Sequence, residues 1–316
     1  NLINHYNYIN NLASDIDPLP TILVTDYSGL TFLDEFSVEQ KLQNPKNLEI
    51  YKKEYLMKYK DIVNTPFASM SNDKSIEHNI VLINLYEKLK SKDFEEIFKK
   101  INKKIYYKYN PCIKVDDFSL SQHLLLSLTE YYNVKRLIGK DKKKYNYLEL
   151  GAGYGRTANM ILSLEENCKY VIADLPASVY FSHKNIKEFF KNKKILKAFN
   201  IDNKEDMREA FEKNDILFVF PHQLNLFDDK TFDISISLGN LCEMERKQIK
   251  QYMKIFEDKS KFLYFKVWEI SGLPYSFFQY YSVHDKKDYE IKDKWKEHFK
   301  TRCFMPNNQF DLGYEF

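Results

Sequence analysis

A cluster of glycines in the middle of the chain offers the clearest chemistry. Gly151, Gly153 and Gly155 stand at alternate positions, after an apolar run at residues 145–150 and before the helix-like stretch TANMIL. Glycine lets a chain turn sharply and lets backbone N–H groups approach a ligand, and the N-terminus of a following helix adds partial positive charge. The dinucleotide fingerprint G-x-G-x-x-G needs glycine at position 156, where this chain has Arg156. The spacing therefore predicts a small-molecule site in this turn and weakens a nicotinamide-cofactor interpretation.

An acidic residue precedes the glycines, in the order Glu149-Leu150-Gly151-Ala152-Gly153-Tyr154-Gly155. This pattern resembles the first motif of class I S-adenosylmethionine-dependent methyltransferases. Asp174 ends the next apolar run, KYVIADLP, where that family uses an acid to bind ribose hydroxyls; helix capping is the structural alternative. The resemblance implies S-adenosylmethionine as cofactor. The residues expected around it are Glu149, Gly151, Gly153, Tyr154, Gly155, Arg156, Asp174, Leu175, His222, Gln223 and Asn240.

Longer strings narrow the resemblance. LELGAGYGRTA, ADLPASVYFSHKNI and GNLCEM, followed by Tyr252, resemble a bacterial family of sugar O-methyltransferases over about residues 115–270. The chain departs from that family after the fourth predicted strand, where Asn240-Leu241-Cys242-Glu243-Met244 lacks the serine of Asn-Ser-x-x-Glu-Met. The resemblance implies methyl transfer to a hydroxyl of a sugar, a nucleotide sugar or a glycan precursor of a surface polysaccharide. The alternatives are a nucleic-acid methyltransferase and a non-catalytic module of a larger glycan-synthesis protein.

Polar side chains after the third and fourth predicted strands complete the expected site. Pro221-His222-Gln223-Leu224 occupies the place where class I enzymes flank adenine, so Gln223 is expected to meet the exocyclic amine. A hydroxyl nucleophile benefits from a base that accepts its proton, typically by about 10²–10⁴-fold. Glu243 is the preferred catalytic residue and His222 the second candidate, with His123 and His284 as alternatives in flanking segments. Two structural interpretations stay open: His222 as an ordinary loop histidine, and Glu243 as a partner of Asn240 in a helix capping box.

Metal ligands are not apparent in the sequence. Asp228 and Asp229 offer adjacent carboxylates, which fit a solvated turn better than a metal site. The four cysteines lie far apart and form no CxxC pair, which argues against a zinc site and a disulfide framework. We expect no metal, and a reducing cytoplasmic environment.

The positioning elements follow from the rhythm of the chain after Gly139. Short apolar runs that alternate with helical stretches predict parallel βαβ units with right-handed crossovers. The predicted strands are residues 145–150, 169–173, 216–220, 232–238 and 262–268. Together with the resemblance, they predict an α/β fold with a doubly wound, Rossmann-like, seven-stranded methyltransferase sheet. Ligands of such sheets bind at the carboxyl ends of the strands.

Three segments are expected along the chain. Residues 1–37 form an N-terminal segment or linker of unknown role, residues 38–140 a helical appendage, and residues 141–316 the methyltransferase domain. Asp116 or Asp117 is expected to cap a helix that Gly139 ends. Apolar stripes at helical spacing mark the appendage core, at Val38, Leu42, Leu48, Tyr51, Tyr55 and Tyr59, and at Ile80, Ile83, Tyr86, Leu89, Phe94, Ile97, Phe98 and Ile101.

Composition limits the partners. The 316 residues carry a formal net charge of only +3, and the lysine run from Lys140 to Lys144 contains Asp141 and indicates a solvated loop. Nucleic acid is therefore not the expected partner. No apolar run approaches the roughly 18 residues of a membrane span, so no integral membrane segment is expected. The chain starts at Asn1 without a signal-peptide pattern, which suggests a piece of a longer, multidomain chain.

Overall fold

A computed structural model describes residues 72–90, 92, 94–108, 112–139, 142–268, 271–272, 283–284, 286–289, 291–303 and 309–316. They belong to two compact units. The larger unit contains the described residues of 131–302 and 309–316, and the smaller unit contains those up to Glu130, together with Cys303. Residues 1–37 and the apolar stripe from Val38 to Tyr59 lie outside the described residues. The expected segment boundaries after residues 37 and 140 stay predictions.

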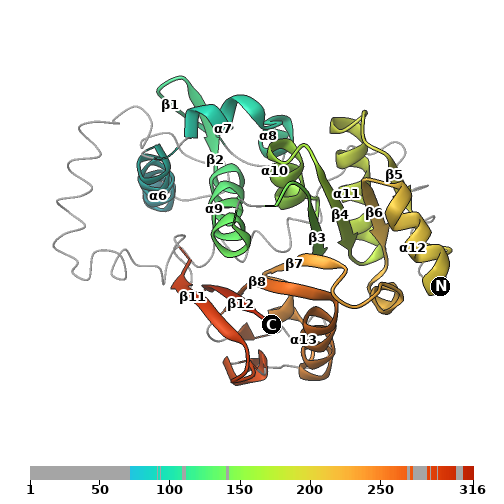
Figure 1. Ribbon diagram of the computed structural model, residues 1–316. Helices are drawn as coiled ribbons and strands as arrows, with labels where there is room; N and C mark the ends of the chain where they lie inside the picture. Colours follow the sequence, from blue (N-terminus) through green and yellow to red (C-terminus); the bar gives the residue numbers. More distant parts are fainter. Residues whose placement is uncertain are drawn as a thin grey trace. The chain divides into compact units, whose positions relative to one another are not determined.

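An eight-stranded sheet forms the centre of the larger unit (Figure 1). Its strands are, in spatial order, β5 (Ile195–Lys197), β6 (Ile216–Val219), β4 (Cys168–Ala173), β3 (Tyr145–Leu150), β7 (Phe232–Leu238), β8 (Ser260–Trp268), β12 (Gln309–Glu315) and β11 (Lys296–Arg302). Neighbours are parallel from β5 to β8, and β12 and β11 add an antiparallel edge. The chain winds outward from β3 in both directions, so the predicted doubly wound α/β fold is confirmed, with one strand more than the seven expected.

Helices cover both faces of this sheet. They are α10 (Arg156–Leu164), α11 (Pro176–Phe189), α12 (Lys204–Lys213) and α13 (Arg246–Lys259). Successive side chains of a strand point to opposite faces. Accordingly, Tyr147 packs in the core cluster that includes residues of α10 and α11, whereas Leu148 packs in the cluster that includes residues of α12 and α13. Parallel strands buried on both faces need apolar residues at nearly every position.

The five predicted strands are all present, and three strands of the sheet were not predicted. β3 and β7 have the expected bounds, while β4, β6 and β8 differ from the prediction by one or two residues. The strands missed by the sequence analysis are β5, β11 and β12. β5 has only three residues, and β11, KEHFKTR, mixes charged and apolar side chains, so neither carries the long apolar run that revealed the others.

The smaller unit is not purely helical. Its elements are α6 (Asn72–Lys90), α7 (Phe94–Lys100), α8 (Lys104–Lys108), β1 (Cys112–Val115), β2 (Phe118–Ser121) and the first part of α9 (Gln122–Ile138). The predicted apolar stripe is buried at Ile80, Ile83, Tyr86, Leu89, Ile97, Phe98 and Ile101. An antiparallel hairpin of β1 and β2 interrupts the expected run of helices.

The predicted cap of α9 is wrong. Asp116 lies in the hairpin turn with a φ of 51°, and its carboxylate accepts hydrogen bonds from Tyr86 Oη (3.1 Å) and Lys90 Nζ (2.8 Å). The side chain that caps α9 is Ser121, whose Oγ accepts a hydrogen bond from Leu124 N–H at 3.2 Å. Gly139 ends α9 as predicted, with a φ of 72°.

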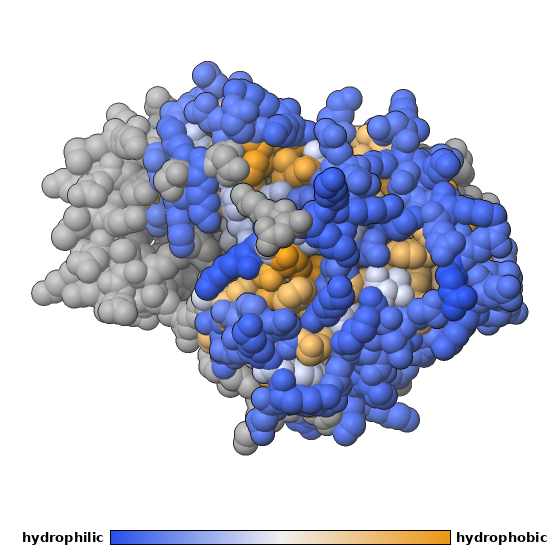
Figure 2. All heavy atoms as spheres, in the orientation of Figure 1, coloured by the Kyte–Doolittle hydropathy of each residue, from blue (hydrophilic) through white to orange (hydrophobic). Residues whose placement is uncertain are grey.

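The surface of the described residues is mainly polar. Figure 2 shows hydrophilic residues over most of one face, with hydrophobic residues visible chiefly in hollows between them. None of the helices within the described ranges combines the length and hydrophobicity that a membrane span requires.

Two tyrosines in the centre of the sheet differ in whether their hydroxyl group is hydrogen-bonded. Tyr147 of β3 and Tyr170 of β4 are paired in register, fully buried and stacked with ring centres 5.6 Å apart. Tyr170 Oη donates to Glu149 Oε2 at 2.7 Å, whereas Tyr147 Oη has no hydrogen-bond partner among the described residues. A buried polar group without a partner destabilises the folded state by about 1–3 kcal/mol.

We therefore expect Tyr147→Phe to raise the melting temperature by about 2–4 °C, because it removes an unsatisfied hydroxyl and keeps the ring. The matched variant Tyr170→Phe breaks the bond to Glu149 and should lower the melting temperature. Calorimetry of both proteins checks the pair. If both variants lost the same amount of stability, the claim that only the Tyr170 hydroxyl has a hydrogen-bond partner would be contradicted.

Candidate functional site

The glycine turn brings the end of β3 close to the loop after β7. Gly151 has a φ of +77° and donates its N–H to Ala173 O at 2.9 Å. A Cβ atom at this position would overlap the side chain of Asn240. Asn240 is held in place because its Nδ2 donates to Leu150 O at 2.9 Å and its Oδ1 accepts a hydrogen bond from Ser237 Oγ. Only glycine allows this approach.

Gly153 faces open space and contacts the predicted acid. A Cβ atom built on Gly153 would find no other atom within 4 Å, and its φ is +56°. Its N–H donates to Asp174 Oδ2 at 2.9 Å, while Leu175 N–H donates to Asp174 Oδ1 at 2.7 Å. The turn and the end of β4 are thus joined at the carboxyl edge of the sheet, where ligands of doubly wound folds bind.

Asp174 retains hydrogen-bonding capacity for a ligand. Its exposed fraction is 8%, and burial raises its pKa to about 6 although Gly153, Leu175 and Ser178 donate hydrogen bonds to it. A carboxylate offers about four lone-pair positions. These three donors leave room for at least one further donor, such as a hydroxyl group of a ligand.

Apolar and aromatic groups lie next to Asp174. Leu175 is 62% exposed, which is unusual for a large hydrophobic residue at a strand end. The neighbouring strand β6 leads into η1 (Pro221–Leu226), where Phe220 stacks on Phe199 at 4.4 Å and the exposed His222 lies 6.2 Å from the Phe220 ring. Because Asp174 N–H donates to Val219 O, the exposed side chains of Leu175 and His222 follow adjacent strand ends.

Gln223 has a structural position. Its exposed fraction is 1%, Oε1 accepts a hydrogen bond from Phe220 N–H, and Nε2 donates to Ala198 O and Ile201 O, each at 2.8 Å. Both amide protons are used, and the group ties the segment after β5 to η1. The Gln223 side chain therefore has no accessible group left for the expected contact with adenine.

Asn240 and Glu243 do not form the capping box that was considered. The structure gives Asn240 no side-chain capping bond at η2 (Leu241–Glu243), because its amide joins the ends of β3 and β7 instead. Glu243 is consequently not held by its predicted structural partner. The amide of Asn240, expected at the cofactor, acts here in shaping the glycine turn.

Glu243 and Tyr252 share the electrostatic environment of Asp174. Glu243 is accessible to solvent, yet protein atoms crowd its carboxyl group, and this loss of hydration together with the charge of Asp174 raises its pKa to about 7. Burial and the same charge raise the pKa of Tyr252 on α13. Three acidic groups therefore gather at the ends of β4 and β7. The sequence analysis gave Tyr252 no role, and its spacing of nine residues from Glu243 carried no signal of proximity.

The remaining predicted residues surround the turn. Glu149 is buried and accepts the hydrogen bond from Tyr170, so its carboxylate connects β3 to β4. Tyr154 is buried, and its carbonyl accepts a hydrogen bond from Asn185 Nδ2 at 3.0 Å. Arg156 is half-buried at the first position of α10. No hydrogen bond within the described part of the chain joins His222 to Glu243.

Other groups considered for catalysis or metal binding lie elsewhere. Asp228 forms an ion pair with Arg208 and Asp229 one with Lys259, as expected for a charged turn. Among the described residues there is no group of three His, Cys, Asp or Glu side chains arranged to hold a metal. His123 is buried in the smaller unit, and the side chain of His284 lies outside the described residues.

Comparison with known proteins finds similar folds only among solved structures. No family model matches the sequence, and no curated protein matches it. Geranyl diphosphate C-methyltransferase from Streptomyces coelicolor A3(2), in complex with Mg2+, geranyl-S-thiolodiphosphate and S-adenosyl-L-homocysteine, is 10% identical with a TM-score of 0.40, over 60% of this chain and 76% of that chain. Magnesium protoporphyrin IX methyltransferase from Synechocystis PCC 6803 with bound SAH is 9% identical with a TM-score of 0.40, over 61% and 85% of the chains.

A third similar structure is the PH0226 protein from Pyrococcus horikoshii OT3, at 15% identity and a TM-score of 0.37, over 60% of this chain and 90% of that chain. Similarities this low transfer neither an acceptor nor a site residue. The doubly wound, Rossmann-like fold is established by the strand order of this chain itself.

The close approach of Gly151 to Asn240 has a measurable consequence. Gly151→Ala should lower the melting temperature at least twice as much as Gly153→Ala, because both substitutions strain a positive φ but only the first displaces the Asn240 side chain. Calorimetry of the two variants tests this. Adding Asn240→Ala to Gly151→Ala should give less than additive destabilisation, and full additivity would show that the two residues do not interact.

Proposed function

We propose that this protein is an S-adenosylmethionine-dependent O-methyltransferase. The observation that carries the proposal is the meeting of Gly153 N–H and the Asp174 carboxylate beside open space at the carboxyl ends of β3 and β4. Glu243 follows β7, which pairs with β3 on the side opposite β4. The charge of Asp174 contributes to the raised pKa of Glu243. A nucleoside site and a proton-accepting group thus occupy the same edge of the sheet.

The residues present fit the proposed cofactor. Asp174 would accept hydrogen bonds from the ribose hydroxyls, and the exposed Leu175 would pack on the adenine ring. The turn around Gly153 would lie along the methionine part, near the N-terminus of α10. S-adenosylmethionine supplies a methyl group that its sulfonium already activates. The protein has to orient the acceptor oxygen, exclude water and accept a proton.

Glu243 is the proposed proton acceptor. A general base works best when its pKa lies near the working pH, and the pKa of Glu243 is raised to about 7. Tyr252, whose pKa is raised by burial and by the charge of Asp174, would hold the acceptor hydroxyl by hydrogen bonding. His222 remains the second candidate for the base because it is exposed and follows the neighbouring strand β6.

The proposed acceptor is a hydroxyl of a sugar or nucleotide sugar used for a surface polysaccharide. This part of the proposal is supported by the sequence resemblance over residues 115–270. A cytoplasmic location is supported by the four cysteines, none of which forms a disulfide. A screen of nucleotide-activated sugars with S-adenosylmethionine as methyl donor, read by mass spectrometry, tests the acceptor class directly.

The cofactor site is tested by Gly153→Val. Its side chain would enter the open space beside Asp174, so we expect no detectable binding of S-adenosylhomocysteine by isothermal titration calorimetry. Gly139→Val is the matched control, since Gly139 also has a positive φ but ends α9 away from the turn. Normal affinity in Gly153→Val would disprove the assignment of this turn to the cofactor.

The role of Glu243 is tested by Glu243→Gln. Wild-type single-turnover rates should rise with pH through about 7 and level off above about pH 8, because only the carboxylate accepts a proton. The variant should lose this rise and about 10² or more in rate, with S-adenosylhomocysteine affinity unchanged. Glu166→Gln, an exposed acid between α10 and β4, serves as control. Full activity of Glu243→Gln would move the base to His222 or another group.

Stability gives a second measurement on the same variant. A carboxyl group whose pKa is raised by folding stabilises the protein at low pH, and this contribution is lost as pH rises through the folded-state pKa. Glu243→Gln should therefore raise the melting temperature more at pH 8.5 than at pH 5.5. Because Glu243 is accessible to solvent, screening limits the gain to about 2–4 °C.

A further inference from the structure

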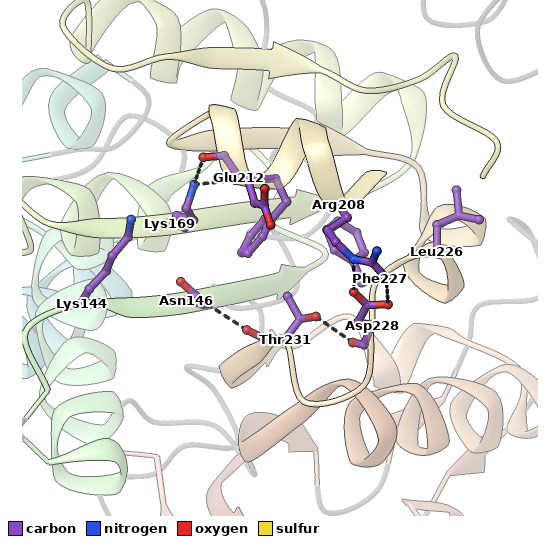
Figure 3. Close-up of a pocket in the computed structure, with 10 residues that line it drawn as sticks. Lys144, Asn146, Lys169, Arg208, Glu212, Leu226, Phe227, Asp228 and Thr231 are labelled. Carbon is purple, nitrogen blue, oxygen red and sulfur yellow. Dashed lines mark hydrogen bonds and ion pairs between the residues drawn. The ribbon is translucent and has the colours of Figure 1, made fainter. Parts of the chain in front are cut away.

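A cavity of about 410 Å³ lies at the opposite edge of the sheet from the glycine turn (Figure 3). Six segments contribute to it: the loop before β3, the start of β3, the start of β4, helix α12, the end of η1, and the turn before β7. The lining residues are Lys144, Asn146, Lys169, Arg208, Phe211, Glu212, Leu226, Phe227, Asp228 and Thr231. Lys144, Asn146 and Lys169 lie at the amino ends of β3 and β4, so this cavity is separate from the proposed methyl-transfer site.

One side of the cavity is apolar. Phe211 and Phe227 have ring centres 5.9 Å apart, and both pack against Phe232, which lies behind them at 5.8 Å and 5.1 Å. Leu226 extends this surface. Small-molecule pockets commonly measure about 300–1,000 Å³ and have mainly apolar walls. The cavity therefore has room and a surface for one ring-sized group.

The polar side of the cavity has unused hydrogen-bond donors. Arg208 gives two N–H groups to Asp228, at 2.7 Å and 3.0 Å, out of the five that a guanidinium carries. Lys144 forms no hydrogen bond or ion pair within the described ranges. Asn146 uses one N–H of its amide, on Thr231 O at 3.0 Å. Donors without protein partners thus face a ligand-sized space from two sides.

Positive charge in this cavity is incompletely balanced. Lys169 Nζ donates to the carbonyls of Phe211, Glu212 and Asn214 at the end of α12, which fixes its position. Burial and the charge of Lys144 lower the pKa of Lys169, whereas the charges of Asp215 and Glu212 raise it. Lys144 itself is exposed, as the prediction of a solvated loop expects. An anion next to Lys144 would offset the repulsion between its charge and that of the anchored Lys169.

We propose that this cavity is a second ligand site, which binds a small anion carrying an apolar ring, such as an aryl carboxylate, sulfonate or phosphate ester. The ring packs on Phe211, Phe227 and Leu226, and the anionic group lies next to Lys144, with Arg208 on the other side of the cavity. Arg208 stays anchored by Asp228, so its remaining N–H groups are oriented before the ligand arrives.

The probe for this site is 8-anilinonaphthalene-1-sulfonate, an aromatic anion whose fluorescence rises on binding. Titrations are made with saturating S-adenosylhomocysteine present, and phenyl phosphate is then added as competitor. Lys144→Glu reverses the charge at the cavity, and Lys143→Glu reverses it at the preceding, exposed residue, which is not part of the lining. The two variants have equal net charge, so non-specific electrostatic effects cancel in the comparison.

We expect phenyl phosphate to displace the probe from wild type and from Lys143→Glu, and to bind Lys144→Glu at least 10-fold more weakly. Leu226→Asn should also weaken binding, because it removes part of the apolar wall. Equal affinities in Lys143→Glu and Lys144→Glu, or no displacement from wild type, would overturn the proposal. None of these outcomes depends on methyl-transfer activity, so they leave the proposed function to its own tests.

Discussion

The hydrogen bond from Gly153 N–H to the Asp174 carboxylate joins the turn after β3 to the end of β4. Neighbouring parallel strands end on the same side of a sheet. In the loops that follow, backbone N–H and C=O groups no longer pair with a neighbouring strand and need other hydrogen-bond partners. Asp174 supplies such a partner to the turn after β3 and to the start of α11. This contact holds the glycine turn against the acid, beside the open space that Gly153 faces. Asn240 stabilises the turn from the side of β7.

The parts of the fold that could be read from the sequence are those with strong local signals. β3 and β7 are central parallel strands in which nearly every residue is buried, and their bounds were predicted correctly. β5 and β11 have no such run, and they are recognisable only through the strands that they pair with. Asp116 illustrates the same limit. An acid before a helical stretch resembles a cap, but the β1–β2 hairpin places it in a turn, where Tyr86 and Lys90 hold it.

The candidate site shows a similar division. The glycines and Asp174 were identified because their roles follow from local backbone geometry at consecutive strand ends. Gln223 and Asn240 were assigned to the cofactor, yet their amides bond to carbonyls far along the chain, at Ala198, Ile201 and Leu150. Periodicity carries no information about such distant acceptors. Tyr252 belonged to the family resemblance but received no role for the same reason, since its relation to Asp174 exists only after α13 packs on the sheet.

Asp174 and Glu243 also give the site carboxyl groups that are partly protonated near neutral pH. With pKa values of about 6 and about 7, these carboxyl groups together hold a fraction of one proton near neutral pH. A cation that bound beside them would lower both pKa values and release that fraction to solvent, whereas a neutral molecule that only displaced water would raise both pKa values and retain it. Ligand binding at this site would thus be coupled to the release or uptake of protons, in an amount that depends on the charge of the ligand. Acidity of the medium would then set the preference of the site between charged and uncharged forms of one ligand.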